Sequence, residues 1–236
     1  MSRRLALEDV RALIVDIDGT LFRGPLPLPG LLRFFTFLRS RRLPAVVVSN
    51  NTTKTAAEYQ KRLAGQGVQM GVDRILTAAA ATAGYLKREL GVGASLYVIG
   101  EPSLHEVLTQ AGFVLLQDAS QPADAVVVGG DSTLTYDKLK NAALLLQRRA
   151  RFVGTNPDLL CPTDEGLVPE AGTTLAALEA ATGMSPTVIG KPERPLFDLA
   201  VQRLGKLPGE VAILGDRLET DVAGGQRAGL KTMLVT

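Results

Sequence analysis

Two aspartates separated by one residue, Asp16 and Asp18, follow directly after a short apolar run at residues 12–15. Side chains two positions apart in an extended chain point the same way, so this spacing brings two carboxylates together. One carboxylate can attack a phosphorus atom, and the other can protonate the oxygen that leaves. Asp16 is the better nucleophile by position, because it directly follows the run, whereas Asp18 lies in a glycine-containing turn.

Two further aspartates, Asp216 and Asp221, follow another apolar run at residues 211–214, and Lys191 follows a third run. If they join the first pair, four carboxylates and one ammonium leave three negative charges, whose repulsion favours binding of a cation. Oxygen ligands suit Mg²⁺, whereas a zinc site needs cysteine or histidine, and the single cysteine and single histidine are too far apart in the sequence to suggest one. The pattern therefore predicts a magnesium site.

Ser49 follows the apolar run at residues 45–48 and precedes a helix that begins with a capping-box pattern at residues 55–58. Its hydroxyl and the neighbouring backbone amides can hold phosphate oxygens, and Lys191 can add a positive charge to the same group. Placing negative charge against fixed donors is most of what phosphoryl transfer requires from a protein. These residues therefore indicate chemistry on a phosphate ester.

Short apolar runs rich in β-branched residues alternate along the chain with segments whose apolar residues recur at helical spacing. The expected strands are 12–15, 45–48, 96–99, 125–128, 152–153, 187–189 and 211–214. The expected helices are 31–41, 56–63, 78–90, 104–111, 136–149, 175–181 and 196–204. This alternation predicts an α/β fold with a doubly wound, Rossmann-like parallel sheet, in which polar residues that follow strands gather beyond the carboxyl ends.

The composition is that of a globular protein, with 46% hydrophobic and 21% charged residues in a chain of 236, enough for one large domain or two small ones. A net charge of +2 without a long basic run argues against binding to nucleic acid or to a membrane surface. The single cysteine, the lack of a membrane-spanning run and the lack of a signal-peptide pattern in residues 1–9 predict a soluble, cytoplasmic protein.

The four polar stretches resemble the four motifs of the haloacid dehalogenase (HAD) superfamily of hydrolases. The matching residues are Asp16-x-Asp18-Gly19-Thr20, Ser49-Asn50, Lys191-Pro192 and Gly215-Asp216-x-x-x-Thr220-Asp221. They occur in the order of the family, each just past an expected strand, which isolated turns would not explain.

The resemblance implies a role for each of these residues. Asp16 would be the nucleophile and Asp18 the general acid and base. The residues implied to bind the substrate phosphate are Ser49, Asn50 and Lys191. The implied Mg²⁺ ligands are Asp16, the Asp18 carbonyl and Asp216, with Asp221 in support.

The spacing of the motifs indicates an inserted second domain. Asp16 and Ser49 are 33 residues apart, which leaves room for a hairpin and a helix but not for a helical cap domain. Ser49 and Lys191 are 142 residues apart, where a helix and one strand would need only about 30. We place the catalytic core at residues 1–76 and 188–236 and an inserted α/β cap domain at 77–187, and we expect the cap to cover and select the substrate.

The inserted domain is similar to that of the 4-nitrophenyl phosphatase, or NagD-like, branch, which carries a type II (C2) cap. The similar segments are 96–100, 126–131, 134–136 and 154–158. By this resemblance Asn156 and Asp158 either face the substrate and influence specificity or form a structural turn. The chain departs from the branch at residues 130–132, Gly-Asp-Ser for the usual Leu-Asp-Arg, and at residues 169–172, Pro-Glu-Ala-Gly for the usual Pro-Gly-Ala-Gly.

The residues and the resemblance together predict a Mg²⁺-dependent phosphomonoester hydrolase that acts on a small phosphorylated metabolite through an aspartyl phosphate. A metal-independent dehalogenase-type hydrolase is the chemical alternative, but it needs neither the proton donor Asp18 nor the Asp216 and Asp221 pair. A receiver-like signalling domain is the alternative from another class, and Asp18 argues against it, because a base beside the nucleophile shortens the life of a signalling phosphate. A monomer and a homodimer formed through the cap both remain open.

Overall fold

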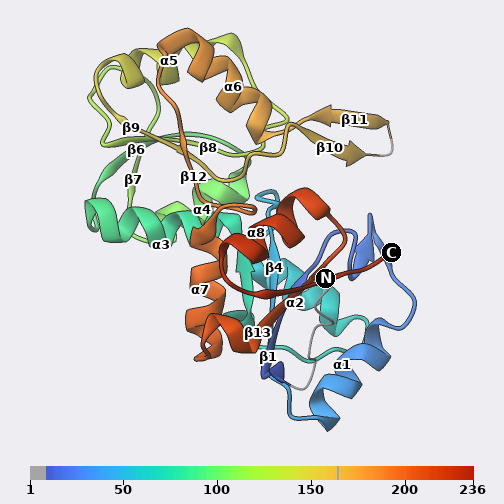
Figure 1. Ribbon diagram of the computed structural model, residues 1–236. Helices are drawn as coiled ribbons and strands as arrows, with labels where there is room; N and C mark the ends of the chain where they lie inside the picture. Colours follow the sequence, from blue (N-terminus) through green and yellow to red (C-terminus); the bar gives the residue numbers. More distant parts are fainter. Residues whose placement is uncertain (1–8, 164) are drawn as a thin grey trace, which may run out of the picture. The chain divides into compact units, whose positions relative to one another are not determined.

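The computed structural model describes residues 9–163 and 165–236 and divides the chain into two compact units (Figure 1). The core unit contains the chain up to Ser49, Ala56–Leu76 and Lys191–Thr236, and the cap unit contains Asn50–Thr55 and Thr77–Gly190. The prediction that residues 1–9 contain no signal-peptide pattern concerns residues that lie, apart from Asp9, outside the described part of the chain. Among the described residues, no helix has the length and apolarity needed to cross a membrane.

The core unit is built on a five-stranded sheet with the strand order β14-β13-β1-β4-β5. The strands are β1 (Ala12–Asp16), β4 (Ala45–Ser49), β5 (Ile75–Thr77), β13 (Val211–Gly215) and β14 (Lys231–Leu234). β1 pairs in parallel with both β4 and β13, and β13 pairs in parallel with β14. The carboxyl ends of β1, β4 and β13 therefore meet at one edge of the sheet, as the sequence predicts.

Helices cover both faces of the core sheet (Figure 1). They are α1 (Leu31–Ser40), α2 (Ala56–Ala64), α7 (Arg194–Leu204) and α8 (Ala223–Arg227). Leu13, Val15 and Val47 form one apolar cluster with residues of α1 and α2, whereas α7 contacts β1 and β4 and packs with α8. Because both faces are covered, β1 is buried along its whole length, which explains the continuous apolar run at residues 12–15.

A hairpin and one helix connect β1 to β4. Strands β2 (Phe22–Arg23) and β3 (Leu26–Pro27) pair in antiparallel fashion, and α1 follows them. This is the content that the 33-residue spacing between Asp16 and Ser49 predicts, so the second domain is inserted elsewhere in the chain.

The cap unit has its own five-stranded sheet, in the order β12-β9-β8-β6-β7. The strands are β6 (Ser95–Ile99), β7 (Val114–Leu116), β8 (Ala125–Val128), β9 (Arg151–Gly154) and β12 (Thr187–Val188), and the pairs are parallel. The helices are α3 (Ala78–Leu90), α4 (Pro102–Gln110), α5 (Tyr136–Gln147) and α6 (Ala171–Thr182). α3 packs with α4 below this sheet and α5 with α6 above it (Figure 1), so the insert is a second α/β layer structure.

Some elements have no counterpart in the sequence-based expectation. They are the two hairpin strands β10 (Leu160–Thr163) and β11 (Gly166–Pro169), the short strands β5 and β7, and the short helix α8. The two strands of the β10–β11 hairpin are mostly exposed and contain prolines, so they lack the apolar run that identifies a buried strand. Length and burial decide which elements the sequence reveals.

The segment 50–55 differs from the expected boundaries, which placed it in the core. The Asn50 carbonyl accepts a hydrogen bond from Asn156 Nδ2 at 3.0 Å, and the Thr52 carbonyl accepts one from Ser103 Oγ at 2.5 Å. These contacts group the segment with the cap unit. The cap unit also extends to Gly190, directly before Lys191.

Candidate active site

The candidate site of the core unit lies where three neighbouring parallel strands end. Asp16 is the last residue of β1 and Ser49 the last of β4, while Asp216 directly follows β13. Parallel strands of an open α/β sheet deliver their polar carboxyl-terminal residues to one crevice, which is the usual ligand site of such folds. The predicted residues from three separate parts of the sequence are thus brought together by strand pairing.

The turn after β1 depends on Gly19. The Gly19 amide donates to the Phe22 carbonyl at 2.7 Å, and Gly19 has a φ of +96°, in the region that favours glycine. A Cβ on Gly19 would lie 2.1 Å from Oδ2 of Asp216. The glycine therefore allows the backbone of this turn to approach the Asp216 carboxylate.

The turn after β13 folds the Asp221 side chain back onto the backbone. Residues 218–222 form a wide helical turn, and Asp221 Oδ2 accepts the Arg217 amide at 3.1 Å. A Cβ on Gly215 would lie 2.2 Å from the Asp221 carboxyl carbon, so this close approach also requires glycine. Asp221 is 1% exposed, and its position is fixed by the local backbone.

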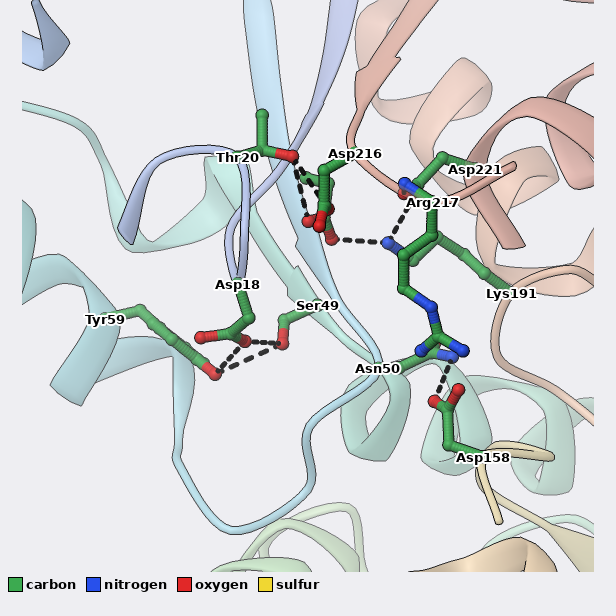
Figure 2. A network of polar contacts seen from close by, with 11 residues as sticks. Asp18, Thr20, Ser49, Asn50, Tyr59, Asp158, Lys191, Asp216, Arg217 and Asp221 are labelled. Carbon is green, nitrogen blue, oxygen red and sulfur yellow. Dashed lines mark hydrogen bonds and ion pairs between the residues drawn. The ribbon is translucent and has the colours of Figure 1, made fainter. Parts of the chain in front are cut away.

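Lys191 joins the two buried carboxylates into one ion cluster. Its Nζ donates to Asp16 Oδ1 and, at 2.6 Å, to Asp221 Oδ1, and all three side chains are almost fully buried. Thr20 Oγ1 lies 3.2 Å from both Asp16 Oδ2 and Asp216 Oδ1, as Figure 2 shows for Asp216. Asp16 is therefore oriented through both of its oxygens.

The charges of this cluster are not balanced. Burial raises the pKa of the Asp16 carboxyl, and the charge of Lys191 opposes that rise. Burial also works against the charge of Lys191, but Asp16 and Asp221 outweigh it and hold the pKa of the ammonium above its usual value. Lys191 is therefore protonated, and further positive charge would favour the ionised form of Asp16.

Three carboxylates of the core unit are arranged as a cation site. One oxygen from each of Asp16, Asp216 and Asp221 lies within 4.8 Å of the others. With Lys191, they leave two uncompensated negative charges, and their donors are all oxygen, which suits a hard divalent cation. The group fits the metal ligands that the sequence predicts, except that the Asp18 carboxylate is not part of it; the resemblance assigns only the Asp18 carbonyl to the metal.

The Asp18 carboxylate belongs to a second group of side chains, in which Asp18 is exposed and its two partners are buried. Its Oδ2 accepts the Ser49 hydroxyl at 2.9 Å and the Tyr59 hydroxyl at 3.1 Å (Figure 2). The Asp18 side chain is 44% exposed, against 6% for Asp16. The two predicted catalytic carboxylates thus have different surroundings: one is buried and fixed, and the other is accessible to solvent.

The remaining predicted residues lie together in the cap unit. Asn50 Nδ2 donates to Asp158 Oδ2 at 2.9 Å, and Asn156 Nδ2 donates to the Asn50 carbonyl. Asn156 Oδ1 accepts the Asp158 amide at 3.0 Å. Asn50 was expected beside Ser49 on the phosphate, and its side chain is instead hydrogen-bonded to Asp158 in this structure. Its binding to phosphate and the specificity roles of Asn156 and Asp158 stay predictions.

Sequence reasoning missed two side chains of the core site. Thr20 belongs to the first motif, but nothing in the sequence shows that its hydroxyl lies between two aspartates from distant parts of the chain. Tyr59 shares the buried stripe of α2 with Leu63, four residues later, so its sequence position predicts a core residue. A phenol at such a position needs a partner for its hydroxyl, which is the one signal that could have been used.

Comparison with known proteins places this chain in a family. Residues 13–114 match the family model of haloacid dehalogenase-like hydrolases, and residues 188–236 match a HAD-hydrolase-like model. An acid sugar phosphatase of Staphylococcus aureus is 35% identical over 229 residues, which are 97% of this chain and 87% of the relative.

Two solved structures share the fold across both units. A p-nitrophenyl phosphatase from Archaeoglobus fulgidus has a TM-score of 0.91 at 32% identity, covering 96% of this chain and 86% of the other. A 4-nitrophenylphosphatase from Thermotoga maritima has a TM-score of 0.90 at 35% identity, covering 98% and 87%. The predicted resemblance is thereby confirmed: the chain belongs to the haloacid dehalogenase-like hydrolases, in the NagD-like branch of phosphatases.

Proposed function

We propose that this protein is a Mg²⁺-dependent phosphomonoester hydrolase that acts through an aspartyl phosphate, an acyl phosphate formed on Asp16. The observation that carries the proposal is the buried cluster of Asp16, Asp221 and Lys191, with Asp216 beside it at the carboxyl edge of the core sheet. The relatives named as phosphatases support the reaction class.

The metal would be held by Asp16, Asp216 and Asp221, together with the Asp18 carbonyl. Two unbalanced negative charges in a largely buried set of oxygen donors fit a divalent cation, and among such cations Mg²⁺ suits carboxylates that leave room for water and phosphate. When bound, the cation would neutralise phosphate charge and thus favour attack by an anionic nucleophile.

The side chains of the core unit can carry out two successive displacements. In the first, a carboxylate oxygen of Asp16 forms a bond to phosphorus as the bond to the ester oxygen breaks, and Asp18 gives its proton to that oxygen. In the second, Asp18 takes a proton from water, whose oxygen attacks the phosphorus and releases phosphate from Asp16. Lys191 and Thr20 hold Asp16 in one orientation throughout. The Ser49 hydroxyl, which donates to Asp18 in this structure, would donate to a phosphate oxygen of the bound substrate.

The decisive test replaces the nucleophile. Asp16→Asn keeps the size of the side chain and should abolish hydrolysis of 4-nitrophenyl phosphate, whereas Asp198→Asn on the exposed face of α7 should not affect it. Residual activity of Asp16→Asn above about 1% of wild type would contradict covalent catalysis by this residue. Asp18→Asn should be slow for every ester, and most so for esters with poor leaving groups.

A second test addresses the metal. Excess chelator should remove the activity and added Mg²⁺ should restore it, with Asp216→Asn shifting the restoration to higher Mg²⁺ concentrations. Full activity in excess chelator would overturn the proposed mechanism and favour the metal-independent, dehalogenase-type alternative.

The substrate that we propose is a small phosphorylated metabolite in the cytoplasm, with no nucleic acid or membrane as partner. The nearly balanced charge of the chain supports this, as do the relatives named for sugar phosphate and 4-nitrophenyl phosphate. We assign substrate selection to Asn156 and Asp158. In a panel of phosphate esters, Asn156→Ala and Asp158→Ala should change the relative kcat/KM among esters; a uniform loss would make both residues structural.

A further inference from the structure

Three side chains of the core unit form a closed triangle of hydrogen-bonding distances around the Asp18 carboxylate. Asp18 Oδ2 lies 2.9 Å from Ser49 Oγ and 3.1 Å from the Tyr59 hydroxyl, and these two hydroxyls are 3.1 Å apart. Figure 2 shows the triangle at the side of the site opposite Lys191. Ser49 and Asp18 have roles in the proposed function, whereas Tyr59 has none so far.

The Ser49 hydroxyl has one proton to donate and two potential acceptors, the Asp18 carboxylate and a phosphate oxygen of the substrate. In this structure it donates to Asp18, and in the proposed function it donates to a phosphate oxygen of the substrate. A hydroxyl carries a single O–H donor, so it cannot do both at once. When substrate binds, Asp18 therefore loses the Ser49 hydrogen bond at the stage when its position matters for proton transfer.

Tyr59 is built to keep its hydrogen bond to Asp18. It lies on the inner side of α2, is 1% exposed and packs in the apolar cluster beneath the sheet, so its ring has little freedom. A phenol is protonated at neutral pH, and the Tyr59 hydroxyl lies 3.1 Å from Asp18 Oδ2, so it can donate to this carboxylate. The position of its hydroxyl is therefore set by helix α2 and by the packed ring.

The same helix also faces the other oxygen of Asp18. Arg62, almost one helical turn after Tyr59, places Nη1 4.0 Å from Asp18 Oδ1, and its guanidinium stacks on the Phe22 ring at 3.7 Å. It also donates to the Gly24 carbonyl. α2 thus faces the Asp18 carboxylate with a buried phenol at hydrogen-bonding distance and with a guanidinium at ion-pair distance.

From this geometry we infer that Tyr59 is a positioning residue, which holds Asp18 for proton transfer while Ser49 turns its hydroxyl to the phosphate. The inference rests on the proposed function and extends it by one residue. The three side chains then have two separate roles. Ser49 hydrogen-bonds to the substrate phosphate, and Tyr59 hydrogen-bonds to Asp18, the general acid and base. Loss of Tyr59 should therefore impair proton transfer to the leaving group more than binding of phosphate.

The test compares two esters on the same enzyme preparation. Phenyl phosphate has a leaving group that needs protonation, whereas 4-nitrophenyl phosphate has one that needs little. For Tyr59→Phe, which keeps the buried ring, we expect the ratio of kcat/KM for phenyl phosphate to that for 4-nitrophenyl phosphate to fall by roughly tenfold. This ratio does not depend on the fraction of enzyme that is folded, so partial loss of stability does not obscure it.

Ser49→Ala is the complementary variant. It leaves Tyr59 in place on Asp18, so the ratio between the esters should stay within about twofold of wild type, while the inhibition constant of inorganic phosphate should rise by roughly tenfold. Tyr136→Phe, at a side chain that is 78% exposed in the cap unit, is the matched control and should change neither quantity.

The outcomes separate the inference from the function on which it rests. An active wild type whose Tyr59→Phe variant slows both esters equally, or not at all, would overturn the positioning role alone. A wild type that hydrolyses neither ester in Mg²⁺ would overturn the proposed function and this inference with it.

Discussion

The core and cap units gather polar side chains in different ways. In the core unit, buried charges bind one another: Lys191 lies between Asp16 and Asp221, and each carboxylate has a second donor. In the cap unit, amide side chains and backbone groups form the network around Asn50, Asn156 and Asp158. A buried charge without its partner is far more costly than a lost amide hydrogen bond. The core network should therefore tolerate few substitutions, and the cap network more.

The departures of this chain from its branch fit that contrast. Both lie in the cap unit, and the structure brings them together: a Cβ on Gly130 would lie 2.5 Å from Glu170 Oε1. Gly130 stands where the branch usually has leucine, and Glu170 where it usually has glycine. The side chain lost at one position leaves room for the side chain gained at the other. Glycine at position 130 thus leaves room for the Glu170 carboxylate in the cap unit.

The largest effect should follow removal of the ammonium from the core cluster. Lys191→Met leaves Asp16 and Asp221 buried together, so we expect a loss of about 3–5 kcal/mol in the free energy of unfolding in the presence of chelator. Urea unfolding measures it, with Lys140→Met, an exposed lysine in the cap unit, as control. Equal stability of Lys191→Met and wild type would show that charge balance does not govern the core cluster.

A smaller but still large effect should follow from a single methyl group at Gly19. Gly19→Ala strains a backbone with a φ of +96° and pushes on the Asp216 carboxylate, so activity should fall by about a hundredfold and the Mg²⁺ requirement should rise. Gly30→Ala has nearly the same φ, +89°, with open space around its Cβ, and should lose some stability but keep its activity. Similar activity losses in both variants would assign the effect to backbone strain alone.

A double-mutant cycle can measure the steric coupling between position 130 and the Glu170 side chain in the cap unit. Gly130→Ala should force the Glu170 carboxylate to move and cost about 1 kcal/mol of stability, and most of that cost should vanish when Glu170→Ala is also present. Urea unfolding of the four proteins gives the coupling. Additive effects would mean that the two departures are independent.

The smallest effect concerns the charge of Glu170. Burial raises the pKa of this carboxyl, Asp158 and Glu101 add to the rise, and hydrogen bonds from Asn156 and the Ala171 amide oppose it. An acid whose folded pKa exceeds its unfolded pKa costs stability as pH rises through that interval. Glu170→Gln should therefore gain stability relative to wild type as the pH rises from about 4.5, the ordinary pKa of the carboxyl, towards neutrality, as measured by urea unfolding. A constant difference across this range would contradict the raised pKa.

Much of the fold could be predicted because its strands are buried on both faces. The runs at residues 12–15 of β1 and 211–214 of β13 are apolar throughout, so each strand is recognisable without knowledge of its neighbours. The β10–β11 hairpin was not predicted, since its stability comes from pairing between two exposed strands rather than from an apolar pattern. Local sequence therefore predicts the burial of a strand well and predicts the pairing of exposed strands poorly.

For the site, the sequence by itself determined which groups are the candidates for the chemistry, because their types and order past successive strands are local properties of the chain. Only the tertiary structure decided their partners. It placed Lys191 between Asp16 and Asp221, Tyr59 on Asp18, the side chain of Asn50 on Asp158, and Glu170 in the space beside Gly130. Each of these contacts joins residues that are at least 30 positions apart in the chain. Such contacts depend on how strands pair and helices pack, and local sequence does not encode them.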